Sequence, residues 1–144
     1  MSEEHKFINI LLVEDNPDDI DITKRAIKEA KIINKFWIAR DGQEALDFLH
    51  HNGAYSDPAT SPKPGLILLD INLPKLNGVD VLRIIKQDAN LKRIPVVMLT
   101  VSKRDEDIIN SYDNGCSSFI QKPVNFENFI SVVKEISLYW GPLF

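Results

Sequence analysis

LILLDI, residues 66–71, places four apolar residues in a row before Asp70 and a fifth, Ile71, after it. An apolar run of this length is typical of a strand that is buried on both faces, at the centre of a parallel sheet. A charged group at the end of such a strand is costly to bury unless it has a partner. The segment therefore predicts a central strand and, where that strand ends, a polar site.

Short apolar runs of the same kind recur along the chain, and segments with helical periodicity separate them. The other strands are predicted at residues 7–13, 35–39, 95–100 and 118–121. The second and the last of these have the weaker patterns that favour edge strands. Between the strands, apolar residues recur at helical spacing, as do Ile20, Ile27 and Ala30 in the first predicted helix.

Strand and helix patterns alternate five times, which predicts an α/β fold with a parallel sheet and helices on both faces. Crossovers between parallel strands are right-handed, so the chain favours an open, doubly wound (βα)5 sheet of five strands. The flavodoxin-like order 2-1-3-4-5 is one of two common choices for such a sheet. Asn16 followed by Pro17 predicts the start of the first helix, and Gly115 predicts the end of the fourth.

Length and composition fit one globular domain. We expect a single domain over residues 1–144, with a core at about 7–137 and an apolar tail at 138–144. The net charge of -4 argues against nucleic acid as a partner, because nucleic acid is bound through clustered Lys and Arg. Neither a membrane-spanning run nor a signal peptide is recognisable, so we expect a cytoplasmic protein with no membrane partner.

Several less regular features have two interpretations each. Cys116, the only cysteine, is interpreted as a packed small side chain, with a reactive thiol as the alternative. The loop at 52–65 is long for a compact domain, and we favour a solvated excursion over a contact for a partner protein. His5, His50 and His51 are interpreted as solvated residues that form neither a metal cluster nor a phosphorelay site.

Polar residues follow four of the five predicted strands. They are Glu14 and Asp15 after the first, Asp70 and Asn72 at the third, Thr100 at the fourth and Lys122 at the fifth. Because the carboxyl ends of parallel strands meet at one edge of a sheet, we expect these side chains to converge. Three carboxylates at close range repel one another unless a cation lies among them.

Magnesium suits such a site, because it binds through one or two carboxylates and leaves positions for phosphate oxygens. We expect Asp15 and Asp70 as direct ligands, the backbone carbonyl of Asn72 as a third, and Glu14 acting through water.

With the metal in place, Asp70 is the candidate nucleophile for a phosphoryl group, and the product is an acyl phosphate on its carboxylate. Lys122 supplies positive charge and the Thr100 hydroxyl supplies a hydrogen bond to the phosphoryl oxygens. Taken singly, these residues also have plain structural interpretations. Glu14 and Asp15 favour a helix N-terminus, and a lone lysine is most often a solvated charge. Their occurrence together at the ends of successive strands is what points to a site.

Four motifs carry a resemblance that covers residues 8 to about 136. LLVEDN contains Glu14 and Asp15, LILLDINLPKLNG contains Asp70, PVVMLT ends in Thr100, and FIQKP contains Lys122. By these residues the chain resembles the receiver domains of two-component response regulators. The resemblance implies that Asp70 is the phosphoacceptor, that Glu14 and Asp15 bind magnesium, that Thr100 is the conformational switch and that Lys122 contacts the phosphoryl group. It also implies a cis peptide bond between Lys122 and Pro123.

The resemblance further implies how the protein signals. Phe119 lies where the family usually has an aromatic switch residue, although it could simply pack in the core. The long loop after His51, the segment at 107–112 and the aromatic tail resemble those of single-domain receivers that serve phytochrome-type sensor histidine kinases, although receivers of this pattern also serve other histidine kinases. Because the sequence ends where an output domain would begin, we expect a stand-alone response regulator that is not an enzyme and signals by protein contact. The 52–65 loop then becomes a candidate contact for that kinase. The apolar tail suggests a homodimer through the last helix.

Two other functions remain in competition with this interpretation. A magnesium-dependent phosphatase or phosphotransferase with an aspartyl nucleophile would need a second acid, but Asn72 stands where that acid is expected. A receiver-like scaffold that never becomes phosphorylated is the other alternative, and the intact set of site residues argues against it.

Val101 follows Thr100, where many receiver domains have a smaller residue. A branched side chain there would narrow access to Asp70. We therefore predict that Val101→Ala speeds autodephosphorylation, measured as the decay of the phosphorylated protein, and an unchanged rate would contradict this hypothesis.

Overall fold

The computed structural model describes residues 8–30, 34–110 and 118–140. In these ranges the chain forms β1 (Ile8–Val13), α1 (Pro17–Glu29), β2 (Asn34–Ala39), α2 (Gly42–His50), η1 (Gly53–Tyr55), β3 (Leu66–Asp70), α3 (Gly78–Gln87), β4 (Val96–Thr100), α4 (Lys103–Asn110), β5 (Ser118–Gln121) and α5 (Phe126–Trp140). The predictions for His5, Gly115 and Cys116 lie outside the described residues, as does the end of the apolar tail. Within the described part, no helix is long and apolar enough to cross a membrane.

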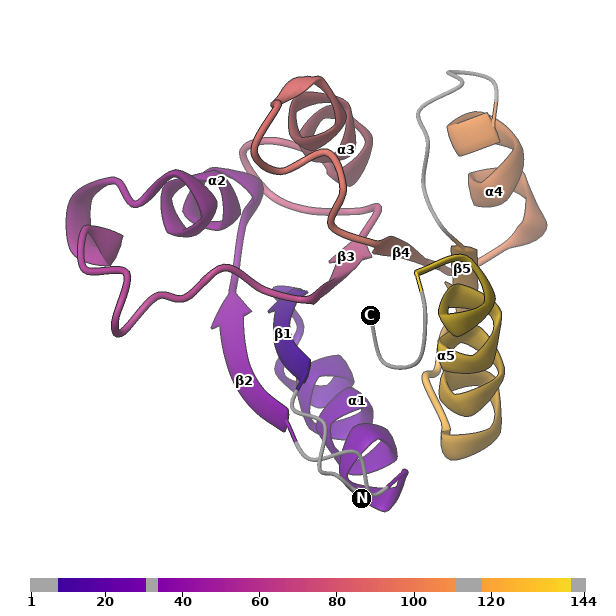
Figure 1. Cartoon of the computed structure of the whole chain (residues 1–144). Coiled ribbons are helices and arrows are strands. Elements are labelled where there is room, and N and C mark those ends of the chain that lie inside the picture. The colour runs from indigo at the N-terminus through magenta and orange to yellow at the C-terminus, as the bar shows by residue number, and fades with distance from the viewer. Residues whose placement is uncertain (1–7, 31–33, 111–117, 141–144) are drawn as a thin grey trace.

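The five strands form one parallel sheet in the order β2-β1-β3-β4-β5, which confirms the predicted fold (Figure 1). The two strands with the weaker patterns, β2 and β5, lie at its edges as expected. The strand predicted from residue 95 begins at Val96 instead. Pro95 has no N–H to donate to the ladder, although its carbonyl accepts a hydrogen bond from the N–H of Ile67 at 3.0 Å.

Each face of the sheet has its own apolar core, because successive strand residues point to opposite sides. On β1, Leu11 and Val13 face α2 and α3, whereas Ile10 and Leu12 face α1 and α5. Figure 1 shows α1 and α5 below the sheet and α2 and α3 above it. The apolar runs predicted as central strands are buried along their whole length, since helices cover both faces.

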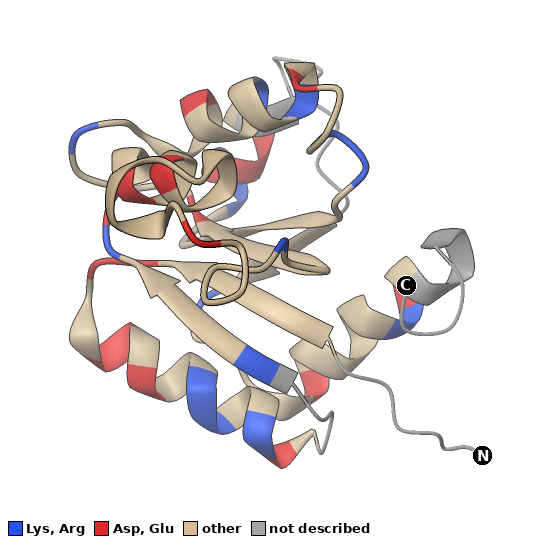
Figure 2. Ribbon diagram, turned by 60° about the vertical axis from the view of Figure 1, so that its left-hand side comes forward, with Lys and Arg blue, Asp and Glu red and all other residues tan. Residues whose placement is uncertain are grey.

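The start of α1 follows the prediction. The side chain of Asn16 caps the helix by accepting hydrogen bonds from the N–H groups of Asp18 and Asp19, and Pro17 occupies the first turn. Acidic residues lie in the first turn of α1, and the last turn contains the basic Lys28 before Glu29 ends the helix (Figure 2); the acidic start and Lys28 are what the helix dipole favours. The cap thus holds a group of carboxylates at the carboxyl edge of the sheet.

The loop at 52–65 is mostly exposed, as the expectation of a solvated excursion requires, but it is also attached to the domain at three points. The indole N–H of Trp37 donates to the carbonyl of Thr60 at 3.1 Å, and a ring nitrogen of His51 lies 2.8 Å from the carbonyl of Ser61. Tyr55 packs against the ring of Phe48 and donates a hydrogen bond to Glu44, which raises the pKa of the phenol to about 12. Sequence patterns do not reveal these anchors because none of them joins residues at a spacing that is typical of a helix, strand or turn.

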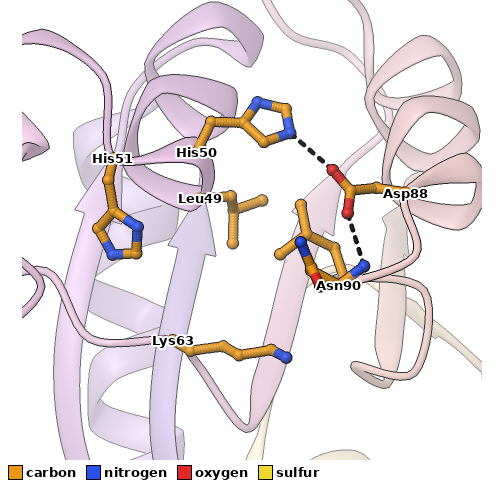
Figure 3. Close-up of a pocket in the computed structure, with 7 residues that line it drawn as sticks. Leu49, His50, His51, Lys63, Asp88 and Asn90 are labelled. Carbon is orange, nitrogen blue, oxygen red and sulfur yellow. Dashed lines mark hydrogen bonds and ion pairs between the residues drawn. The ribbon is translucent and has the colours of Figure 1, made fainter.

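At the end of α2, His50 is exposed as predicted and His51 is half-buried, and both have polar partners that the sequence did not predict. His50 pairs with Asp88 at 3.0 Å and thereby joins the ends of α2 and α3, and His51 binds the loop. Together with Leu49, Lys63 and Asn90, these residues line a cavity of about 270 Å³ (Figure 3). The cavity lies beside the chain that enters β3, at the end of the strand opposite Asp70. The N–H of Asn90 and the His50 ring lower the pKa of Asp88.

Gly78 lets α3 begin directly against the end of β3. Its N–H donates to the carbonyl of Ile71 at 3.0 Å. A Cβ at this position would collide with the backbone oxygen of Asp70 and would lie 2.8 Å from the Cα of Ile71. No other residue type fits without moving the backbone that carries Asp70.

We predict that Gly78→Ala lowers the free energy of unfolding by about 1–3 kcal/mol, the usual effect of overpacking a filled site. Urea denaturation measures the change. Gly65→Ala is the matched control, because a Cβ there would lie 3.7 Å from the nearest side-chain atom, in ordinary contact. Equal effects of the two substitutions would contradict the steric explanation.

Candidate functional site

The order of the strands brings the predicted site residues to one edge of the sheet. Asp70 ends β3, and β1 and β4 lie on either side of that strand. Glu14 follows β1, Thr100 ends β4, and Lys122 follows β5, the next strand along. All of these strands are parallel, so their last residues meet at the same edge of the sheet.

Glu14, Asp15 and Asp70 form a cluster whose candidate ligand atoms all lie within 4.8 Å of one another. Glu14 and Asp70 are buried, whereas Asp15 is exposed. The donor set contains only carboxylate oxygens, which is the chemistry that hard cations such as magnesium prefer. The residues therefore fit a divalent cation.

Asn72 lies beside this cluster. Its N–H donates to the Oδ1 atom of Asp70 at 3.2 Å, which ties the backbone after β3 to the carboxylate. The role of its carbonyl as a metal ligand stays a prediction.

Lys122 contacts three carboxylates that come from three different elements. Its Nζ lies 2.7 Å from Oε1 of Glu14, 3.1 Å from Oδ2 of Asp70 and 3.2 Å from Oδ2 of Asp19. The lysine side chain is 13% exposed, so water screens these contacts weakly. The peptide bond to Pro123 is cis, as the resemblance implied.

The charges in this cluster shift the pKa values of its members. Burial raises the pKa of Glu14 to about 7; Lys122 opposes this shift, and the nearby Asp70 carboxylate adds to it. Burial alone would lower the pKa of Lys122, but Glu14 and Asp70 outweigh it and raise that pKa above its usual value. The ammonium thus stays charged and compensates the buried carboxylates.

Thr100 has a fully buried hydroxyl with no hydrogen-bond partner among the described residues. A buried hydroxyl without a partner is unfavourable by about 1–3 kcal/mol. Oε1 of Glu14 has Lys122 as an ion-pair neighbour but likewise lacks an aligned hydrogen bond. The Thr100 hydroxyl can therefore engage a ligand at this edge of the sheet without losing an existing hydrogen bond, whereas a cation at Oε1 of Glu14 would compete with Lys122.

Two further predicted residues flank the site. Phe119 is partly buried and packs against the core on the α2 and α3 side, as its packing interpretation expects, and its role as a switch stays a prediction. The side chain of Val101 is 55% exposed. Its N–H donates to Asp105 and its carbonyl accepts from Gln121, which fixes the start of the β4–α4 connection.

Asp19 is the site residue that the sequence analysis did not single out. It lies in the first turn of α1, where acidic residues are common because they stabilise a helix N-terminus. The sequence places Asp19 only a few residues after Glu14 and Asp15. This proximity alone does not predict a contact with Lys122.

An open doubly wound sheet with carboxylates, a threonine and a lysine at its carboxyl edge defines the receiver class of α/β domain. The family model described as the response regulator receiver domain matches residues 10–134, and the chain belongs to this family. It is therefore a receiver-domain response regulator.

Its relatives include proteins described as phytochrome and bacteriophytochrome response regulators. Response regulator Rcp1 of Synechocystis sp. is 42% identical over 131 residues, which cover 91% of this chain and 87% of that protein. The bacteriophytochrome response regulator RtBRR has a TM-score of 0.86 and 37% identity, over 94% of this chain and 81% of that one. A phosphorylated cyanobacterial phytochrome response regulator, RcpA, has a TM-score of 0.75 and 41% identity, over 94% of each chain. Rcp1 is also known in an Mn(2+)-bound form, with a TM-score of 0.73 and 41% identity over 92% of this chain and 94% of that one.

We predict that Lys122→Met destabilises the protein strongly in the presence of a chelator, by about 3 kcal/mol or more, because it leaves buried carboxylates without a counter-charge. Saturating divalent cation should reduce that loss, since the cation binds the same carboxylates in the folded state. Urea denaturation under both conditions tests this.

Lys103→Met is the control, because the Lys103 side chain is 79% exposed and its removal should matter by less than about 1 kcal/mol. If Lys122→Met lowers the free energy of unfolding equally with and without the divalent cation, the explanation by uncompensated carboxylate charge is wrong.

Proposed function

We propose that this response regulator accepts a phosphoryl group on Asp70 from a sensor histidine kinase and signals by protein contacts that depend on this modification. The observation that carries the proposal is the position of the Asp70 carboxylate, which lies within the cation-binding cluster and 3.1 Å from the Lys122 ammonium. The relative RcpA, described as phosphorylated, supports it.

In the proposed reaction, an oxygen of Asp70 attacks the phosphorus atom, a bond between that oxygen and phosphorus forms, and the bond from phosphorus to the donor breaks. Lys122 pairs with the negative oxygens of the transferred group, and the free hydroxyl of Thr100 donates a hydrogen bond to one of them. We propose Mg²⁺ as the cation held by Asp15 and Asp70, with Glu14 acting through water and the carbonyl of Asn72 as a further ligand. When bound, magnesium neutralises the charge that develops on the phosphoryl oxygens.

The proposed partner is a phytochrome-like sensor histidine kinase, on the strength of the relatives described as phytochrome and bacteriophytochrome response regulators. In this proposal the protein catalyses only its own phosphorylation and dephosphorylation. A phosphatase of this kind would need a second carboxylic acid two residues after Asp70, and Asn72 occupies that position instead.

The remaining parts of the proposal concern assembly and location. A homodimer through α5 and the residues after it would cover the apolar side chains of the tail, and the negative net charge gives nucleic acid no electrostatic attraction. We propose that the protein works in the cytoplasm, where sensor kinases hold their phosphorylated histidine, and that residues 1–144 fold as one domain.

Intact-protein mass spectrometry after incubation with magnesium and a small acyl-phosphate donor tests the proposal. We expect one added phosphoryl group in the wild-type protein and none in Asp70→Asn or in the presence of a chelator. Asp80→Asn is a matched control, because Asp80 lies on α3 and pairs with Arg83 at the surface. It should be phosphorylated like the wild type.

A wild-type protein that stays unmodified with both small donors and histidine kinases would favour the unphosphorylated scaffold. Equal modification of Asp70→Asn would place the phosphoryl group elsewhere.

A further inference from the structure

Asp19 contacts the lysine of the site without belonging to the metal cluster. Its Oδ2 lies 3.2 Å from Nζ of Lys122 and accepts a hydrogen bond from it. The described carboxylates that could share a metal ion are Glu14, Asp15 and Asp70, and Asp19 is not among them. The Lys122 ammonium therefore contacts two carboxylates that a cation would also bind, and a third, Asp19, that the cation would not bind.

The capping structure of α1 holds Asp19 in this position. The N–H of Asp19 donates to Oδ1 of Asn16 at 3.0 Å, and the N–H of Asn16 lies 3.3 Å from Oε2 of Glu14. Pro17 fixes the backbone between them. Asp19 and Glu14 are thus tied to the same turn, and their side chains reach the same ammonium group from α1 and from the end of β1.

The charges explain what this contact does. In the absence of a metal, Lys122 neutralises the oxygens of Glu14 and Asp70 and thereby competes with any cation that binds there. An additional carboxylate outside the metal cluster offers the ammonium an alternative partner when the cation enters. The same carboxylate opposes a phosphoryl group on Asp70, because it retains Lys122 and adds a negative charge nearby.

We propose that Asp19 is a positioning residue that competes with Asp70 for the ammonium group of Lys122. Through this competition Asp19 favours the binding of a cation and weakens the binding of a phosphoryl group on Asp70. The proposal rests on the proposed function of Asp70 and Lys122. It predicts that removal of the Asp19 charge changes the two affinities in opposite directions, which a merely structural role of Asp19 would not do.

The test compares Asp19→Asn with wild type by titration calorimetry on the intact chain. Magnesium is titrated first. Beryllium fluoride, which forms a phosphoryl-like adduct on carboxylates, is then titrated at saturating magnesium. We expect magnesium to bind about fivefold more weakly and beryllium fluoride about fivefold more tightly, the size expected for one charge at contact distance near water.

Asp18→Asn is the matched control for net charge. Asp18 is the neighbour of Asp19 in the same helical turn and is exposed, but its carboxylate is not among the described partners of Lys122. This variant should leave both affinities close to those of the wild type. If Asp19→Asn behaves like Asp18→Asn, or shifts both affinities in the same direction, the proposal is wrong.

A second comparison separates positioning from simple repulsion. In a Lys122→Met background, Asp19→Asn should no longer strengthen the binding of beryllium fluoride by the same factor, because no ammonium remains to be released. An undiminished effect would show that Asp19 acts through its charge alone and would overturn the positioning role. If wild type binds neither magnesium nor beryllium fluoride, the proposed function itself fails, which is distinct from a failure confined to Asp19.

Discussion

The structure of the site depends on one partly buried ammonium group, that of Lys122. The ammonium of Lys122 lies between a carboxylate that follows β1, one that ends β3 and one in the first turn of α1, and it compensates the buried charges of Glu14 and Asp70. Carboxylates this close would otherwise repel one another or take up protons. Burial already raises the pKa of Glu14 and so favours its protonated form. The rest of the edge is arranged around this contact.

The sheet makes that contact possible between residues that are far apart in the chain. More than a hundred residues of sequence lie between Glu14 and Lys122, yet the order β2-β1-β3-β4-β5 brings the ends of their strands to one edge. The two apolar cores that clamp the sheet keep these ends in register. The distances between the charged groups are therefore set by the whole fold, whereas the type of group at each position is set by a single residue.

The sequence was sufficient to predict the fold because the dominant signals are local ones. Unbroken apolar runs identified the central strands, Asn16 and Pro17 identified the start of α1, and parallel topology then required Asp70, Thr100 and Lys122 to converge. What could not be predicted depends on contacts between distant segments. The pairing of Asp19 with Lys122, the attachment of the 52–65 loop through Trp37, and the bond from His50 to Asp88 have no pattern in the sequence, because each partner is an ordinary polar residue by itself.

The tight fit at Gly78 also bears on how the domain would respond to the proposed phosphorylation of Asp70. No space is left between the first residue of α3 and the backbone of Asp70, so neither can shift toward the other without a steric clash. The other side of Asp70 is different, because the buried Thr100 hydroxyl on β4 has no described partner to hold it. Under the proposed function, a phosphoryl group on Asp70 would meet a filled contact on the α3 side and an unpartnered hydroxyl on the β4 side, so we expect the domain to respond through β4 and α4 rather than through α3.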